Sequence, residues 1–250
     1  MRILILSDIH ANLNALTAVL QDAGTFDAAW CLGDLTGYGP DPNECIRLVS
    51  SLPGLVCLMG NHDAAVIDKI DLNSFNKEAR QAALWTRKVL TRENFEFLQN
   101  LPEKQEINGI TLAHGSPRNP IWEYLLDTYT AAINFTAFET DYAFVGHTHI
   151  PICYLLGEEE RMEWRIMKED EEISLISRGI LNPGSVGQPR DRDRRAAYAI
   201  FQPEEKLWTS QRVEYDVTPV QIRIRTAGLP KRHAQRLAGK AQGSHLDRLP

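Results

Sequence analysis

The sequence predicts a mixed α/β (or α+β) fold, and two observations support this prediction. Before residue 60, short apolar runs at 4–7, 29–33 and 55–59 alternate with segments of helical spacing. This strand-helix order is typical of a partly parallel sheet. Beyond about residue 106 the apolar residues alternate or cluster at strand spacing, so we expect a second half that consists mostly of strands.

Helices are expected after each of the early strands. Apolar residues recur at helical spacing in 13–20 and in 45–49, each directly after an early strand. Residues 73–101 also carry helical spacing, and Thr91 is a suitable N-cap for a second helix within that stretch.

Strands dominate the predicted second half, with one helix near residues 129–138. The expected strands cover residues 110–113, 143–145, 150–156, 162–167, 173–176 and 196–201. The acidic stretches 158–160 and 169–172 lie where hairpin turns would be. Asn182-Pro183-Gly184 suits a tight turn packed beneath a site.

Composition and charge indicate an ordinary globular protein. The 250 residues are 43% hydrophobic and 24% charged, and no repeat or long linker divides them, so we expect a single domain over 1–250. The net charge is +6 from Gln221 onward and −12 before it. We interpret 217–250 as a basic helical segment with solvated faces, broken near Gly228. The acidic remainder disfavours a nucleic-acid partner, and no oligomeric state is predicted.

The first ten residues and the cysteines bear on where in the cell the protein is located. The opening MRILILSDIH has an apolar run too short for a signal peptide or a membrane span, so no membrane contact is expected. The four cysteines include no CxxC pair, and three lie within apolar runs. Buried free thiols are therefore favoured over disulfides or a zinc knuckle, which predicts a cytoplasmic location.

Five predicted strands end in residues of the types that bind metals. These endings are Asp8-Ile9-His10, Gly33-Asp34, Gly60-Asn61-His62-Asp63, His114-Gly115 and Gly146-His147-Thr148-His149. Ligands of open α/β sheets bind at the carboxyl ends of the strands, so we expect the five endings to meet in one crevice. One such motif alone more often forms a turn or a cap. Five of the seven histidines lie in these motifs, however, which supports a shared site.

The expected metal ligands are Asp8, His10, Asp34, Asn61, His114, His147 and His149. Seven donors exceed the need of one tetrahedral ion and suit two ions that share a carboxylate, so we predict a binuclear site. Imidazole, carboxylate and amide donors without thiolate favour two divalent transition-metal ions among Mn²⁺, Fe²⁺, Zn²⁺, Ni²⁺ and Co²⁺. The neutral amide leaves more positive charge on the ions, which suits an anionic substrate such as a phosphate. His62, beside that amide, is free to act as a proton donor.

These motifs, in this order, resemble those of the calcineurin-like metallophosphoesterase family: Asp-x-His, Gly-Asp, Gly-Asn-His-Asp, a single His, then Gly-His-x-His. Two further segments, Gly37-Tyr38-Gly39-Pro40 and Asn182-Pro183-Gly184-Ser185, are similar to a bacterial branch of small phosphoesterases in that family. The resemblance implies a four-layer αββα sandwich with two metal ions at the edge of the paired sheets.

The resemblance also implies a role for each ligand. One ion would be held by Asp8, His10, Asp34 and His149, and the other by Asp34, Asn61, His114 and His147, with Asp34 bridging. In the family a metal-bridging hydroxide attacks phosphorus in line, while the two cations neutralise the phosphate oxygens. His62 would protonate the leaving alkoxide or contact a phosphate oxygen.

One departure from the family pattern bears on the substrate. Gly37 and Tyr38 stand where the protein Ser/Thr phosphatases carry a second Asp and an Arg, which disfavours phosphoproteins. A small phosphomonoester or phosphodiester is expected instead. Arg118, four residues after His114, is the candidate for binding the substrate phosphate, and Arg190 is a weaker candidate.

Two other functions are compatible with parts of the pattern. Amidohydrolases and metallo-β-lactamase-like hydrolases also place His-x-His near metals, but they generally begin with that pair, whereas here Asp8-x-His10 comes first. The main alternative is a metal-binding regulatory module with little or no catalysis, because the sequence shows no partner that would orient His62. Against it, every expected ligand and His62 itself are present.

Overall fold

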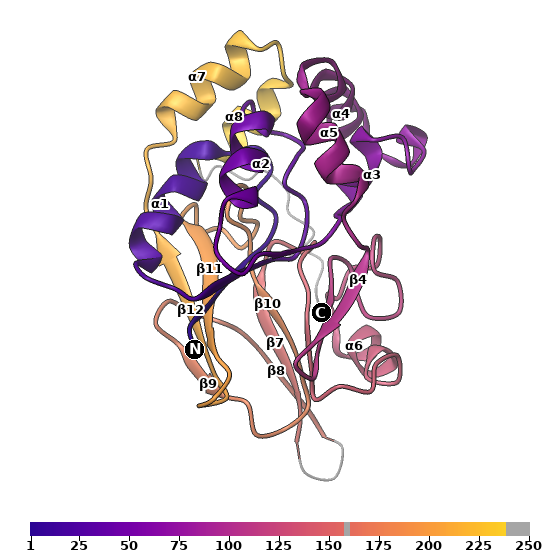
Figure 1. Ribbon diagram of the computed structural model, residues 1–250, viewed down its shortest axis with the longest axis vertical. Coiled ribbons are helices and arrows are strands. Elements are labelled where there is room, and N and C mark those ends of the chain that lie inside the picture. Colours follow the sequence, from indigo (N-terminus) through magenta and orange to yellow (C-terminus); the bar gives the residue numbers. More distant parts are fainter. Residues whose placement is uncertain (158–160, 239–250) are drawn as a thin grey trace.

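The computed structural model describes residues 1–157 and 161–238, which form two six-stranded mixed sheets (Figure 1). The strand order of the first sheet is β3 (Val56–Cys57), β2 (Ala28–Cys31), β1 (Ile3–Leu6), β11 (Ala196–Gln202), β12 (Leu207–Val213) and β9 (Glu172–Ser174). The order of the second is β4 (Lys104–Ile107), β5 (Ile110–Ala113), β6 (Tyr142–Phe144), β10 (Gly179–Pro183), β7 (Pro151–Leu156) and β8 (Met162–Ile166). β1 pairs in parallel with β2, and β2 with β3, while β6 runs parallel to both β5 and β10.

Helices connect these strands and cover the outer faces of the sheets (Figure 1). They are α1 (Leu13–Ala23), α2 (Pro42–Ser50), α3 (Asn61–Val66), α4 (Lys77–Val89), α5 (Arg92–Gln99), α6 (Thr128–Asn134), α7 (Thr218–Thr226) and α8 (Lys231–Arg236), with a 3-10 turn η1 (Leu72–Ser74) before α4. The predicted cap at Thr91 is confirmed, because its Oγ1 accepts a hydrogen bond from Asn94 N at 3.4 Å as α5 begins.

The layers run helix, sheet, sheet, helix, which confirms the expected αββα sandwich. Between the sheets, the Phe144 ring packs against Trp208 and Phe201 at centroid distances of 4.8 and 5.2 Å. Burial of each such ring stabilises the fold by roughly 1.5–3 kcal/mol. α1 and α2 pack on the outer face of the first sheet, and α6 with the residues after it packs on the outer face of the second.

Up to residue 238 the carboxyl-terminal segment forms two helices, as predicted, and the chain between them turns at Gly228, whose φ is +70°. Val220, Ile224 and Ala234 bury their side chains against one another and against Ala82 of α4. The helices therefore pack on the body of the protein. Residues 239–250 of the predicted basic segment lie outside the described residues, and the single-domain interpretation stays a prediction.

Two sequence-based expectations about turns were wrong. Residues 169–172 do not close a hairpin, because β8 and β9 belong to different sheets and this stretch crosses between them. Asn182 and Pro183 end β10, so the turn begins only at Gly184 (φ +85°). The other acidic stretch, 158–160, lies outside the described residues.

Among the elements that were not predicted, three were missed for identifiable reasons. In β12 the buried alternate positions are Trp208, Ser210 and Arg212, so polar side chains hide the period of two. β4 is short and contains one apolar residue in Lys104–Ile107. α3 is a single six-residue segment that coincides with the Gly-Asn-His-Asp motif, which masked its helical character.

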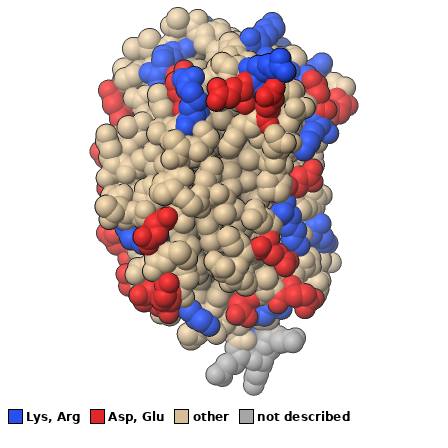
Figure 2. Space-filling model, in the orientation of Figure 1, with Lys and Arg blue, Asp and Glu red and all other residues tan. Residues whose placement is uncertain are grey.

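The four cysteines are buried and free, as predicted. None of the described helices is long and apolar enough to cross a membrane. On the face shown in Figure 2, Lys and Arg side chains are interspersed with Asp and Glu, and the middle of that face is largely uncharged. This face therefore presents no continuous basic surface of the kind that binds a phosphate backbone.

Candidate metal centre

The predicted ligands meet at the carboxyl ends of β1, β2 and β3 in the first sheet and of β5 and β6 in the second. In chain order these residues are Asp8, His10, Asp34, Asn61, His114, His147 and His149, each at most 3% exposed. His10 and His149 are 139 positions apart in the chain, yet their Nε2 atoms lie 3.1 Å apart. The convergence that the sequence predicted is therefore observed.

Asp8, His10 and His149 form one half of the cluster. His149 Nε2 lies 3.3 Å from Asp8 Oδ1, and the two donor atoms close a triangle with His10 Nε2. Donor atoms bound to one ion at about 2.1 Å lie roughly 3 Å from one another. The spacing of these three atoms fits that requirement.

The other half is formed by Asp34, Asn61, His114 and His147. His114 Nε2 lies 3.3 Å from Asp34 Oδ2, 3.2 Å from Asn61 Oδ1 and 3.2 Å from His147 Nδ1. Asp34 Oδ2 is also 3.6 Å from His10 Nε2 in the first half. One oxygen of Asp34 therefore faces both halves, which is the position of a shared ligand.

Each carboxylate of the cluster has one oxygen held by the protein and one without a partner. Asp8 Oδ2 accepts hydrogen bonds from Ser7 Oγ at 2.7 Å and His147 N at 2.9 Å, and Asp34 Oδ1 accepts one from His62 N at 2.9 Å. Asp8 Oδ1 and Asp34 Oδ2 are buried without any hydrogen-bond partner among the described residues. Buried oxygens without a partner cost free energy, and a bound cation would satisfy both of them.

Backbone carbonyls fix the imidazole rings in one tautomer. The Nδ1 atoms of His10, His114 and His149 lie 2.8, 2.9 and 2.6 Å from the carbonyl oxygens of Thr36, Leu32 and Gln188. A carbonyl only accepts, so each Nδ1 carries the proton and donates it. The lone pair of each Nε2 is then directed into the cluster, as in histidines that bind metals. The residues present thus fit a pair of divalent ions.

Comparison with known proteins identifies the family. Residues 1–206 match the calcineurin-like phosphoesterase superfamily domain. The chain belongs to this superfamily.

Relatives match over nearly the whole chain. Uncharacterized protein MJ0912 of Methanocaldococcus jannaschii is 40% identical over 246 residues, covering 94% of this chain and 96% of that protein. The crystal structure of a metallophosphoesterase from Sphaerobacter thermophilus is 45% identical with a TM-score of 0.88, covering 96% of this chain and 100% of that one. Hypothetical protein PH1004 from Pyrococcus horikoshii shares the fold at 22% identity, with a TM-score of 0.76 and coverage of 94% and 97%.

The charged groups of this phosphoesterase cluster shift one another's pKa values. Burial raises the pKa of Asp8 to about 6, although His114 opposes the shift. Burial would also raise the pKa of Asp34, but the positive charge of His114 and its neighbours holds that pKa below the ordinary value. Burial lowers the pKa of His114, yet Asp34 and Asp8 outweigh burial and raise it to about 9. The negative charge of the two carboxylates therefore favours a cation at this position.

Five of the seven predicted ligands have a left-handed backbone. The φ angles of Asp8, His10, Asp34, His147 and His149 lie between +47° and +67°. Few residues other than glycine adopt this region, and such strain is concentrated at functional sites. These five residues lie two to five positions after the ends of β1, β2 and β6, in the loops that carry the cluster.

Gly60 is required for the approach of two of these loops, although its own φ is −91°. A Cβ at Gly60 would lie 2.0 Å from Asp34 Oδ1 and 2.3 Å from Asp34 N. We expect Gly60→Ala to lower the free energy of unfolding by about 1–3 kcal/mol and to lower the metal content. Denaturant unfolding and elemental analysis check this.

The matched control is Gly109→Ala. Gly109 has a φ of +75° but open space around its Cβ position. That variant should lose some stability through backbone strain and keep its metal content. Equal metal content in both variants would contradict the proposed role of Gly60.

His62 lies beside the first half of the cluster, whereas its neighbour Asn61 faces the second. Its ring centroid is 5.0 Å from that of His10 and 4.4 Å from that of Tyr38. Its Nδ1 has no hydrogen-bond partner among the described residues, and a Cβ at Gly37 would lie 2.4 Å from that atom. Burial, opposed by Asp34, lowers the pKa of His62 to about 4.

Asp63 was part of a predicted motif but received no role, and the structure supplies one. Its carboxylate accepts hydrogen bonds from the backbone N–H groups of Gly60, Leu35 and Thr36 at 2.9–3.2 Å, and from the Thr36 hydroxyl at 2.9 Å. It therefore ties the loop after β2 to the loop after β3. The sequence signal was its place in the Gly-Asn-His-Asp motif.

The two candidate arginines lie in different surroundings. Arg118 is 46% exposed, and its guanidinium forms an ion pair with Glu123. Arg190 is half-buried, its backbone N–H donates to His149 O at 3.3 Å, and its guanidinium donates to the Tyr38 hydroxyl at 3.3 Å. The structure thus brings Arg190, the weaker sequence candidate, to the cluster.

Proposed function

We propose that the protein is a phosphoesterase that uses two divalent transition-metal ions to hydrolyse a phosphomonoester or a phosphodiester. The observation that carries the proposal is the pair of buried oxygens Asp8 Oδ1 and Asp34 Oδ2, which have no hydrogen-bond partner among the described residues and each lie 3.3 Å from an imidazole Nε2 atom. Membership in the calcineurin-like phosphoesterase superfamily supports it.

The ligand sets follow from the two halves of the cluster. Asp8, His10 and His149 would hold one ion, Asn61, His114 and His147 the other, and Asp34 would belong to both. When bound, two such ions lower the pKa of water and neutralise phosphate oxygens. The protein holds the donors in place beforehand, because backbone groups fix both carboxylates and three of the imidazoles.

His62 is proposed to protonate the leaving oxygen or to contact the phosphate. Its pKa of about 4 leaves the ring neutral at pH 7 in the free protein. The negative charge of a bound phosphate would favour the protonated ring, and the positive charge of the ions would oppose it. Protonated His62 would donate its proton to the leaving oxygen.

Arg118 stays a prediction as a phosphate ligand, and its ion pair with Glu123 competes with that role. Arg118→Ala tests it through kcat/KM for a chromogenic ester. A loss of kcat/KM of more than about threefold would support a contact between Arg118 and the substrate, and a smaller change would contradict it. Thermal unfolding of the same variant separates any effect on the fold.

The regulatory-module alternative rests on one observation: among the described residues, no hydrogen-bond partner orients His62 Nδ1. Bis(p-nitrophenyl) phosphate and p-nitrophenyl phosphate, assayed with added Mn²⁺, distinguish the two functions. We expect hydrolysis of at least one ester, two ions per chain by elemental analysis, and loss of activity with a chelator. Two bound ions without hydrolysis of either ester would favour the regulatory module. A cytoplasmic location stays a prediction.

A further inference from the structure

Arg190 lies between two tyrosines that flank the metal centre. Its guanidinium donates to the hydroxyl of Tyr38, whose ring packs against His10 at a centroid distance of 4.5 Å. Tyr124 stacks on His147 in the other half of the cluster at 3.8 Å, and the charge of Arg190 acts on Tyr124 too. Arg190 therefore reaches the edge of both halves.

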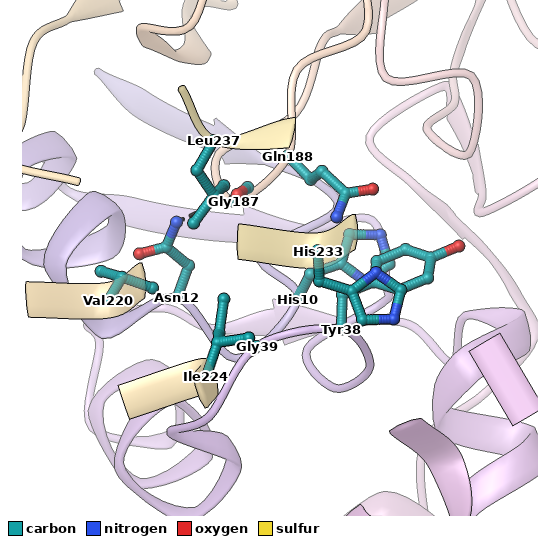
Figure 3. Close-up of a pocket in the computed structure, with 10 residues that line it drawn as sticks. All are labelled: His10, Asn12, Tyr38, Gly39, Gly187, Gln188, Val220, Ile224, His233 and Leu237. Carbon is teal, nitrogen blue, oxygen red and sulfur yellow. Dashed lines mark hydrogen bonds between the residues drawn. The ribbon is translucent and has the colours of Figure 1, made fainter. Parts of the chain in front are cut away.

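A second arginine reaches the same place from α8. Arg236 Nη1 donates a hydrogen bond of 3.3 Å to Oε1 of Gln188, which lies two residues before Arg190 in the chain. His233 of the same helix packs its ring on Tyr38 at 4.8 Å. Tyr38, Gln188 and His233 line one cavity of about 10 Å³ between the cluster loops and the helices α7 and α8 (Figure 3). So small a cavity means that α8 packs closely on these loops. The hydrogen bond to Gln188 holds Arg236 beside them.

Neither arginine has an ion pair within the described residues, in contrast to their neighbours. Arg212 pairs with Asp191, and Arg195 pairs with Asp193 and Glu169. Arg190 Nε is buried without any hydrogen-bond partner in the part of the chain that the structure describes. Burial lowers the pKa of Arg236, and the positive charge of Arg190 lowers it further.

Two half-buried guanidinium groups that repel each other are unfavourable unless an anion joins them. Two bound divalent ions would add to this positive charge, because the carboxylates of Asp8 and Asp34 would offset only half of it. Guanidinium groups bind phosphoryl oxygens through paired N–H donors. An anion that reached from the metal centre to α8 would meet both arginines.

We propose that Arg190 and Arg236 form a subsite for a second phosphoryl group of the substrate, next to the metal centre. This inference rests on the proposed function, since the first phosphoryl group is the one at the ions. The substrate class is then a phosphoester that carries a further phosphoryl group, such as a di- or triphosphate derivative, rather than an ester with a neutral remainder.

Calorimetric titration of the metal-free full-length protein tests the subsite without any turnover. Tripolyphosphate is the probe, inorganic phosphate is the single-group reference, and citrate is a polyanion without phosphoryl groups. We expect the wild-type protein to bind tripolyphosphate at least about tenfold more tightly than phosphate or citrate. Arg236→Gln and Arg190→Gln should each reduce this preference about tenfold.

Arg232→Gln is the matched control. Arg232 lies on the same helix, is 53% exposed and pairs with Glu78 at 3.8 Å, and the substitution removes the same charge. It should leave the preference unchanged. An equal loss in Arg232→Gln, equal binding of citrate, or no preference in the wild type would overturn the subsite. Failure of the metal-loaded protein to hydrolyse any ester would overturn the proposed function instead, and the titration would still decide the subsite.

Discussion

Asp34→Asn is expected to empty at least one of the two metal positions and to lower kcat/KM by at least about 100-fold. Asp34 Oδ1 accepts the His62 N–H, so the amide oxygen of asparagine would take that position. Its NH₂ group would then occupy the place of Oδ2 and direct donors toward His114 Nε2 and the shared ion position. The variant would lose both the charge and the bridging lone pair.

Elemental analysis and steady-state kinetics on the same preparation check this result. Asp141→Asn is a suitable control, because Asp141 is exposed just before β6 and the substitution is chemically identical. It should retain two ions and full activity. Two ions and unchanged kinetics in Asp34→Asn would refute the bridging role and, with it, the binuclear assignment.

His62→Ala should keep both ions and lower kcat by about 100- to 10,000-fold. The ring contributes no atom to the two halves of the cluster as assigned, and the backbone N–H that holds Asp34 is unaffected by the substitution. The loss should be larger for esters of poorly acidic alcohols than for p-nitrophenyl esters, because a poor leaving group depends more on protonation.

The dependence on the leaving group separates a proton donor from a phosphate contact. An equal loss for all esters would indicate that His62 only contacts the phosphate. A loss of metal in parallel with the loss of rate would make His62 a ligand, which its position within 4.8 Å of His10 and Asp34 donor atoms allows. Full activity would remove His62 from the mechanism.

The sequence predicted which residues would converge because their signal is local. Each motif follows an apolar strand. One such motif can be a turn or a cap, but five strand ends that all carry Asp, His or Asn indicate a shared site. Asp34 and His147 could be named without coordinates for this reason. The strands with an apolar period, such as β5 and β7, were predicted on the same basis.

Residues that reach the site from distant loops gave a weaker signal or none. Arg190 looks like any loop arginine in sequence, and only the packing of 184–190 against His149 and Tyr38 brings it to the site. Tyr124 lies in a loop without regular structure, so nothing in its neighbourhood indicated that it stacks on His147. The alternation in β12 was hidden because Arg212 is buried by its ion pair with Asp191 rather than by apolar character.

The proposed ligands are divided between the sheets: Asp8, His10, Asp34 and Asn61 follow strands of the first, and His114, His147 and His149 follow strands of the second. A folding intermediate with only one sheet formed would hold too few donors to retain two ions. Metal capture would therefore be a late step of folding, completed after the sheets dock. Once bound, the ions would act as a cross-link between the sheets and slow their separation during unfolding.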